Sequence, residues 1–182
     1  MSPRLLYLLP TSELYGGIRV VLEHAAGMAR RGWRVTVAGP GPAPDWHPLD
    51  VPYVEVDLAE PATLPPAEVV VATFWTTVAA AHASGAPHVF HFCQGFEGVH
   101  REYAPILDEI DAIYRLPIPK LLISAHLAPV LAERYGCRTH LVGQAIDTAL
   151  FSPGDFREAP RPLRIGVVGP FGVRSKGIPE LL

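Results

Sequence analysis

The chain has 182 residues, of which 49% are hydrophobic, so it can bury one core and shows little that favours disorder. Its net charge of -3 gives no general attraction to nucleic acid or to an anionic membrane, although a local patch would still allow peripheral membrane contact. Cys93 and Cys137 are too few for a disulfide framework, and the first apolar run is too short for a signal peptide or a membrane span. These features favour a protein of the reducing cytoplasm.

Short apolar runs recur along the chain and alternate with turns or helical patterns. The predicted strands are Arg4 to Leu9, Arg34 to Ala38, Tyr53 to Val56, Val69 to Thr73, His88 to Phe92, Leu121 to Ser124, Thr139 to Val142 and Leu163 to Val168. Because these runs are continuously hydrophobic, they are typical of a parallel sheet covered on both faces. The predicted fold class is therefore α/β, a Rossmann-like parallel sheet with helices on both faces.

Three helices are predicted between these strands. The first carries apolar residues at helical spacing from Val21 to Ala29 and stops at Gly32. The second runs from Trp75 to Ala83, and the third runs from Ala125 to Tyr135 and ends at Gly136. The proline-rich stretches 39–48 and 61–66 are predicted to be surface loops.

The order of these patterns predicts two domains joined by a linker. Residues 1–152 form the first, Rossmann-like domain, residues 153–162 are rich in proline and charge, and residues 163–182 begin a second domain. The sequence ends at Leu182, before that second domain could build a core. We therefore expect the front part of a longer protein, inactive alone. Its last strand is expected either to dock on the first domain or on another copy of the chain, which would give a homo-oligomer, or to fray.

Two glycines, Gly16 and Gly17, follow the first strand where the first helix begins. Glycine lets the backbone approach a ligand closely, and the free N–H groups of a helix start attract an anion such as a diphosphate. The same glycines would also suit a tight turn with no ligand. A dehydrogenase would carry G-x-G-x-x-G here and an acidic residue after the second strand, and both are absent, so a nicotinamide cofactor is not expected.

Polar residues follow the fifth predicted strand, at the carboxyl end where open α/β sheets bind ligands. Gln94 and Glu97 could bind sugar hydroxyls, and His100 is a weaker candidate for binding or for proton movement. Alternatively, the loop satisfies its own polar groups.

His88, His91 and Cys93 belong to residue types that bind zinc. Residues 88 and 91 are an odd number apart, so they point to opposite faces of a strand and cannot share one ion. No metal site is predicted, and the two cysteines are expected to be small core or loop residues.

Four stretches in the same order resemble the family 4 glycosyltransferases, which have the GT-B fold. They are the Gly16–Gly17 loop, Ser124 with Tyr135–Gly136, Ile146-Asp147-Thr148 with Phe151 and Pro153, and Val168-Gly169 with Lys176-Gly177. The resemblance covers essentially the whole chain. Two positions depart from the pattern: Gln144-Ala145 stands where the family carries Asn-Gly, and Pro170 stands where it carries Arg.

The resemblance implies two Rossmann-like domains facing across a cleft, with this chain on the acceptor side. It implies transfer of a hexose with retention from a UDP- or GDP-linked sugar to a carbohydrate, lipid-linked or natural-product acceptor, without a metal or a further cofactor. The segment from Gln94 to Glu97 looks like the Gln-Asp-Tyr-Glu segment of one branch of the family. Lys176 matches one of the family's diphosphate-binding cations, and Arg174 is a substitute for the other; both would otherwise be part of a solvated basic turn.

A second class of function fits the same fold. A flavodoxin-like module that binds a small molecule or acts in regulation would be complete without a second domain. The predicted strand and basic turn from Leu163 to Lys176 distinguish the two hypotheses, because a self-contained module has no use for them.

Overall fold

The computed structural model describes residues 2–154 together with Pro162 and Gly166. The chain divides into a unit of Met1–Gln144 and a unit of Ala145–Leu182, and the sheet lies in the first. Within the described residues, no helix is long and apolar enough to cross a membrane. The predicted linker and the start of a second domain fall almost entirely outside the described residues.

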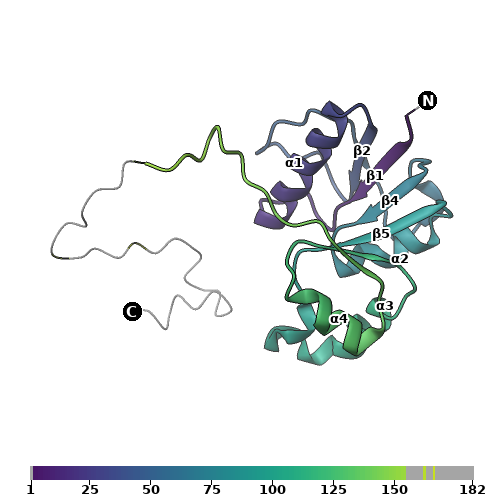
Figure 1. The fold of residues 1–182 in the computed structure, drawn as a ribbon. Helices are drawn as coiled ribbons and strands as arrows, with labels where there is room; N and C mark the ends of the chain where they lie inside the picture. Colours follow the sequence, from purple (N-terminus) through teal and green to yellow (C-terminus); the bar gives the residue numbers. More distant parts are fainter. Residues whose placement is uncertain (1, 155–161, 163–165, 167–182) are drawn as a thin grey trace. The chain divides into compact units, whose positions relative to one another are not determined.

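Seven strands form one parallel sheet (Figure 1). They are β1 Arg4–Leu8, β2 Arg34–Gly39, β3 Tyr53–Glu55, β4 Val69–Ala72, β5 His88–Cys93, β6 Lys120–Leu122 and β7 Thr139–Leu141. Their order across the sheet is β3-β2-β1-β4-β5-β6-β7, and every neighbouring pair is parallel. The first seven predicted strands are thereby confirmed, and the eighth, Leu163 to Val168, lies outside the described residues.

Helices cover both faces of the sheet, so the predicted α/β Rossmann-like fold class is confirmed. The helices are α1 Gly16–Arg30, α2 Trp75–Ala83, α3 Leu107–Tyr114 and α4 Leu127–Tyr135, with 3-10 turns at Pro61–Thr63, Glu97–Val99 and Arg101–Ile106. Helix α1 packs on one face, and α2, α3 and α4 pack on the other (Figure 1).

The two faces of the sheet follow from the alternation of side chains along each strand. Leu5 and Tyr7 of β1 point toward α1, whereas Leu6 and Leu8 point toward α2. All four side chains are buried, which is why the run is continuously hydrophobic. Burial of each such leucine stabilises the fold by about 1.5–3 kcal/mol.

The helices differ from the prediction in two places. Helix α3 was not predicted from the sequence. Helix α4 begins at Leu127 rather than at Ala125, because the preceding residues form a turn in which the Leu127 N–H donates to the Ser124 carbonyl at 3.3 Å. The helix ends at Gly136 as predicted, and the φ of +64° at this residue is one that glycine adopts without strain.

Asp111 joins α3 to α4. Its Oδ1 accepts hydrogen bonds from the Tyr135 hydroxyl at 2.6 Å and from Arg134 at 3.1 Å, and its Oδ2 lies 3.4 Å from Arg115. The hydrogen bond from Tyr135 is the main reason that the pKa of Asp111 lies below its ordinary value, and Arg134 lowers it further. The carboxylate therefore stabilises the fold at neutral pH, and this contribution is lost as the pH falls through the lowered pKa.

We predict that Asp111→Asn lowers the free energy of unfolding at pH 7 by about 1–3 kcal/mol, because it weakens hydrogen bonds to a charged acceptor. The difference from the wild type should shrink as the pH falls, since the wild-type carboxylate is then protonated too. Urea unfolding between pH 7 and pH 2.5 measures both effects. Asp108→Asn, at an exposed position on the same helix, is the matched control. A difference that stays constant across this pH range would contradict the assignment.

Candidate functional site

The carboxyl ends of all seven strands lie at one edge of the sheet, because every strand is parallel to its neighbours. The direction of chain progression reverses between β1 and β4: β2 and β3 lie on one side of β1, and β4 to β7 lie on the other. Open α/β sheets bind ligands outside the carboxyl ends at such a reversal. A ligand site is therefore expected at the loops that follow β1, β4 and β5.

Hydrogen bonds hold the loop between β1 and α1 in place. Trp46, in the proline-rich loop after β2, donates from its indole N–H to the Ser12 carbonyl at 2.8 Å. Thr11 Oγ1 accepts the Glu13 N–H at 3.2 Å. The chain between the first strand and Gly16 is thus anchored before the helix begins.

Two helices begin near the reversal, and in neither does the side chain of the cap residue bind the first turn. At the start of α2, Thr77 Oγ1 accepts the N–H groups of Thr73 at 3.0 Å and of Phe74 at 3.3 Å. At the start of α1, Tyr15 occupies the cap position and makes no side-chain hydrogen bond to the first turn. Gly16 is exposed, so the positive end of α1 is open to an anion.

Gln94 and Gly17, which the sequence nominated separately, are in contact. The Gln94 side-chain amide donates to the Gly17 carbonyl at 3.0 Å, and this hydrogen bond links the end of β5 to the first turn of α1. A Cβ added at Gly17 would lie 3.3 Å from Gln94 Nε2, whereas one at Gly16 would meet nothing within 4 Å. Any side chain at position 17 would therefore press on the Gln94 amide.

Glu97 is half-buried, and a buried tyrosine forms a hydrogen bond with its carboxylate. The hydroxyl of Tyr114, a fully buried residue of α3, donates to Glu97 Oε2 at 2.7 Å. Burial raises the pKa of Glu97, and the hydrogen bond from Tyr114 opposes that rise. No sequence pattern pointed to Tyr114, because it lies 17 residues from Glu97 on a helix that was not predicted.

His100 lies at the rim of the same loop. Its side chain is exposed, and its ring packs edge-on against Tyr103 with 6.5 Å between the ring centroids. Its backbone N–H donates to the Glu97 carbonyl at 2.9 Å, which closes the short 3-10 turn. The structure thus places His100 on the same loop as Gln94 and Glu97.

Two buried basic residues on adjacent strands lie beside the Tyr114 ring. They are His91 of β5 and Lys120 of β6. The Lys120 ammonium lies 5.6 Å from the centre of the Tyr114 ring, and burial lowers its pKa. Burial also lowers the pKa of His91, to about 3, so this imidazole is neutral at neutral pH. Among the described residues, neither Lys120 Nζ nor His91 Nδ1 has a hydrogen-bond partner.

His91 is buried and His88 is exposed, as their opposite directions on one strand require. Within the described part of the chain, no group of three or more His, Cys, Asp or Glu side chains is placed to hold a metal ion. Cys93 is buried and Cys137 is half-buried, and both are free thiols.

The other candidate residues predicted from the sequence belong to the second unit. Arg174 and Lys176 lie outside the described residues. In the segment that resembles the family signature, the carbonyl of Asp147 accepts the N–H groups of Leu150 and Phe151, and its Oδ1 accepts the Ala149 N–H at 2.9 Å. Ala145, which stands where the family carries glycine, does not have a positive φ.

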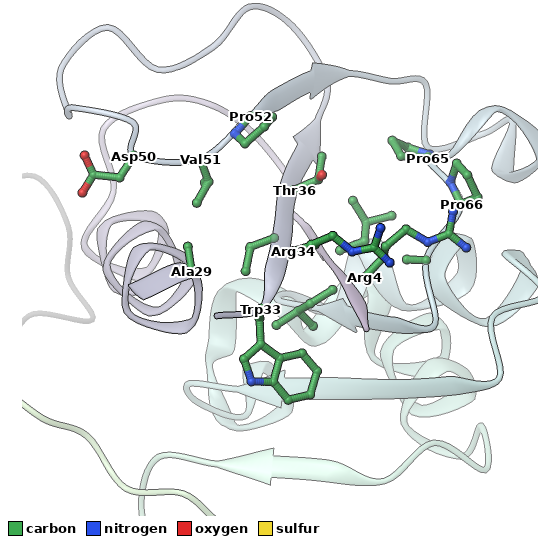
Figure 2. A pocket seen from close by; sticks show the side chains of 14 residues that line it. Arg4, Ala29, Trp33, Arg34, Thr36, Asp50, Val51, Pro52, Pro65 and Pro66 are labelled. Carbon is green, nitrogen blue, oxygen red and sulfur yellow. The ribbon is translucent and has the colours of Figure 1, made fainter. Parts of the chain in front are cut away.

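A hollow of about 430 Å³ lies at the opposite edge of the sheet, at the amino ends of β1 and β2. Figure 2 shows Arg4 and Arg34 in its wall, with Pro65 and Pro66 toward one end and Asp50 toward the other. Both arginines are already engaged: Arg4 binds Glu68 at 3.1 Å, and Arg34 Nε donates to the Ser2 carbonyl at 2.9 Å. None of the residues nominated from the sequence lines this hollow, so we place the candidate site at the carboxyl edge.

No model of a known protein family matches the chain, and no curated protein matches it. Among solved structures, one assigned as an NAD-dependent epimerase/dehydratase from Methylobacillus flagellatus is similar, with a TM-score of 0.42 and 18% identity. The similarity covers 68% of this chain and 54% of that one, so the chain spans about half the length of its neighbour. A likeness of this size bears on neither the family nor the function of the chain.

We predict that Gly17→Ala displaces the Gln94 amide, because the new methyl group would press on it, and that Gly16→Ala leaves it in place. In ¹⁵N-resolved NMR spectra, the side-chain NH₂ resonances of Gln94 should shift strongly in the first variant and little in the second. Thermal unfolding of both variants controls for loss of the fold. Equal shifts in the two variants would show that the contact does not depend on Gly17.

We further predict that Tyr114→Phe raises the pKa of Glu97 above its already raised value, because the carboxylate loses the donor that favours its charged form. A carboxyl ¹³C titration of Glu97 measures this change. Tyr103→Phe, which removes a nearby hydroxyl that makes no hydrogen bond to Glu97, is the control. An unchanged Glu97 pKa in Tyr114→Phe would mean that the hydrogen bond has no influence on the carboxylate.

Proposed function

We propose that the chain is the acceptor-side domain of a retaining glycosyltransferase similar to family 4, which transfers a hexose from a UDP- or GDP-linked donor to a sugar-containing acceptor. The observation that carries this proposal is the contact between Gln94 and Gly17. It brings the polar loop after β5 to the open first turn of α1, at the edge where α/β sheets bind ligands. A site for a diphosphate would thereby adjoin a site for sugar hydroxyls.

Each group at this edge suits one part of the reaction. The open N–H groups at the start of α1 favour the negative charge that builds up on the departing nucleoside diphosphate. Gln94 offers an amide oxygen to a sugar hydroxyl, since its NH₂ group is engaged with Gly17. Glu97, held by Tyr114, accepts a hydrogen bond from a second hydroxyl, and we assign exposed His100 to the acceptor as well.

In the proposed reaction, the bond between the anomeric carbon and the diphosphate oxygen breaks, and a bond from that carbon to an acceptor oxygen forms on the same face. The acceptor hydroxyl gives its proton to the departing diphosphate oxygen, and the nucleoside diphosphate leaves as the other product. Arg174 and Lys176 are proposed to bind the diphosphate from the second domain.

The end of β2 argues against a dinucleotide cofactor at this edge. Dinucleotide-binding sheets carry an acidic side chain there, which binds the ribose hydroxyls. Here Gly39 ends the strand, and an added Cβ would lie 3.0 Å from the Leu9 carbonyl oxygen and 3.2 Å from the Tyr53 hydroxyl. No side chain fits at this position without a shift of the backbone.

The test is a transfer assay with the natural protein, in which a panel of UDP- and GDP-linked hexoses is offered with sugar and lipid-linked acceptors and the products are identified by mass spectrometry. We expect transfer with retained anomeric configuration. Glu97→Gln should lower kcat/KM about 10- to 100-fold, the range for loss of a hydrogen bond to a charged group. Glu133→Gln, exposed on α4, is the control and should match the wild type. Transfer with none of the donors, or equal activity of the two variants, would contradict the proposal.

A further inference from the structure

A second groove lies at the amino edge of the sheet, away from the candidate site. It has a volume of about 630 Å³ and lies over the starts of β5, β6 and β7. Its polar lining consists of four basic side chains, His82, His88, Arg138 and His140, and no carboxylate lines it. The remaining lining residues are one alanine, three prolines and larger apolar residues.

Strand register brings most of these groups to one face of the sheet. Lys120 pairs with His91 on one side and with Thr139 on the other, so the preceding residues Phe90, Pro119 and Arg138 lie in one row. Leu121 and His140 are partners two residues further along the strands, and so lie on the same face as that row. Phe90 and Leu121 are only half-buried, which leaves an apolar floor beside the basic groups.

The four basic side chains are exposed and are not engaged elsewhere. Among the described residues, none of them makes a side-chain hydrogen bond or an ion pair. Glu68 precedes the neighbouring strand β4; its carbonyl accepts the His88 N–H, and its carboxylate is bound to Arg4. This distinguishes the groove from the hollow in Figure 2, where both arginines are already engaged.

The negative end of α2, which carries His82, opposes an anion here. The partial negative charge at this helix end is reduced, because both the N–H and the hydroxyl of Ser84 donate to the Ala81 carbonyl, at 3.3 and 2.7 Å. The guanidinium of Arg138 carries a full charge and five donors in a planar fork that suits carboxylate or phosphate oxygens. The balance of charge in the groove is therefore positive.

We propose that this groove binds a small organic anion, with a carboxylate or phosphate head group on Arg138, His88 and His140 and an apolar body on Phe90 and Leu121. This site is independent of the proposed glycosyl transfer, because it shares no residue with the carboxyl edge. A ligand of this kind would act at a distance from the candidate site.

The experiment is an NMR titration of the 182-residue chain with phenyl phosphate and, separately, with sodium benzoate. We expect saturable shifts at His88, Val89, Arg138 and His140 with at least one of the two, and the tighter binder identifies the head group. Benzyl alcohol has a similar body without charge, and inorganic phosphate has the charge without a body. Both should bind more weakly. No saturable shift with either anion, or equally tight binding of benzyl alcohol or inorganic phosphate, would overturn the proposal.

Variants make the assignment specific. Arg138→Gln should weaken binding of the tighter anion about tenfold, as expected for loss of one charged hydrogen bond. Its backbone role, acceptance of the Lys120 N–H at 2.9 Å, is retained, so the fold should persist and circular dichroism should match the wild type. Arg30→Gln removes an equal charge from an exposed position on α1 outside the groove and should leave binding unchanged. His88→Gln is a second variant within the groove and should also weaken binding. Equal affinities of Arg138→Gln and Arg30→Gln would contradict the proposed site.

Discussion

Parallel pairing of all seven strands forces each connection of the chain to return outside the sheet, since consecutive strands must start from the same edge. The returning helices cover both faces, which is why β1 is buried on its Leu5 side and on its Leu6 side alike. Parallel pairing also gives the two edges of the sheet different kinds of loop. Loops that enter helices gather at the carboxyl edge, and loops that leave helices gather at the amino edge.

The carboxyl edge owes its organisation to two long-range hydrogen bonds. Gln94 binds the Gly17 carbonyl across 77 residues of sequence, and Tyr114 binds Glu97 from the helix that follows. One bond positions the loop after β5 against α1, and the other holds a carboxylate whose pKa burial has raised. The first turn of α1 beside these bonds has no side-chain cap. This open helix start is the physical basis for the proposed diphosphate site.

Much of the fold could be predicted from the sequence, because strands buried on both faces appear as apolar runs. Strand β6 shows the limit of that rule: it was predicted to begin at Leu121, yet it begins at Lys120, whose ammonium is buried against the Tyr114 ring. Helix α3 was missed because its apolar pattern is short and carries Asp111, which is buried through its bonds to Tyr135 and Arg134. In both cases a charged residue is buried by contacts between different elements, which local patterns do not reveal.

The candidate site could likewise be predicted only in part. Gly17, Gln94 and Glu97 could be nominated because each stands at the end of a strand or at the start of a helix, which is a local property. That Gln94 contacts Gly17, and that Tyr114 supports Glu97, could not be foreseen, because no periodicity links residues so far apart. The basic groove at the amino edge also depends on strand register, which local patterns do not specify.

The central claim is that ligands bind at the carboxyl edge, between the start of α1 and the loop after β5. Hydrogen exchange of the natural protein, measured by mass spectrometry with and without saturating UDP- or GDP-linked sugar, tests it most directly. We predict slower exchange in peptides covering residues 12–19 and 94–100, with little change at the amino ends of the strands. Protection confined to the amino edge, or none in either of the two segments, would contradict the account.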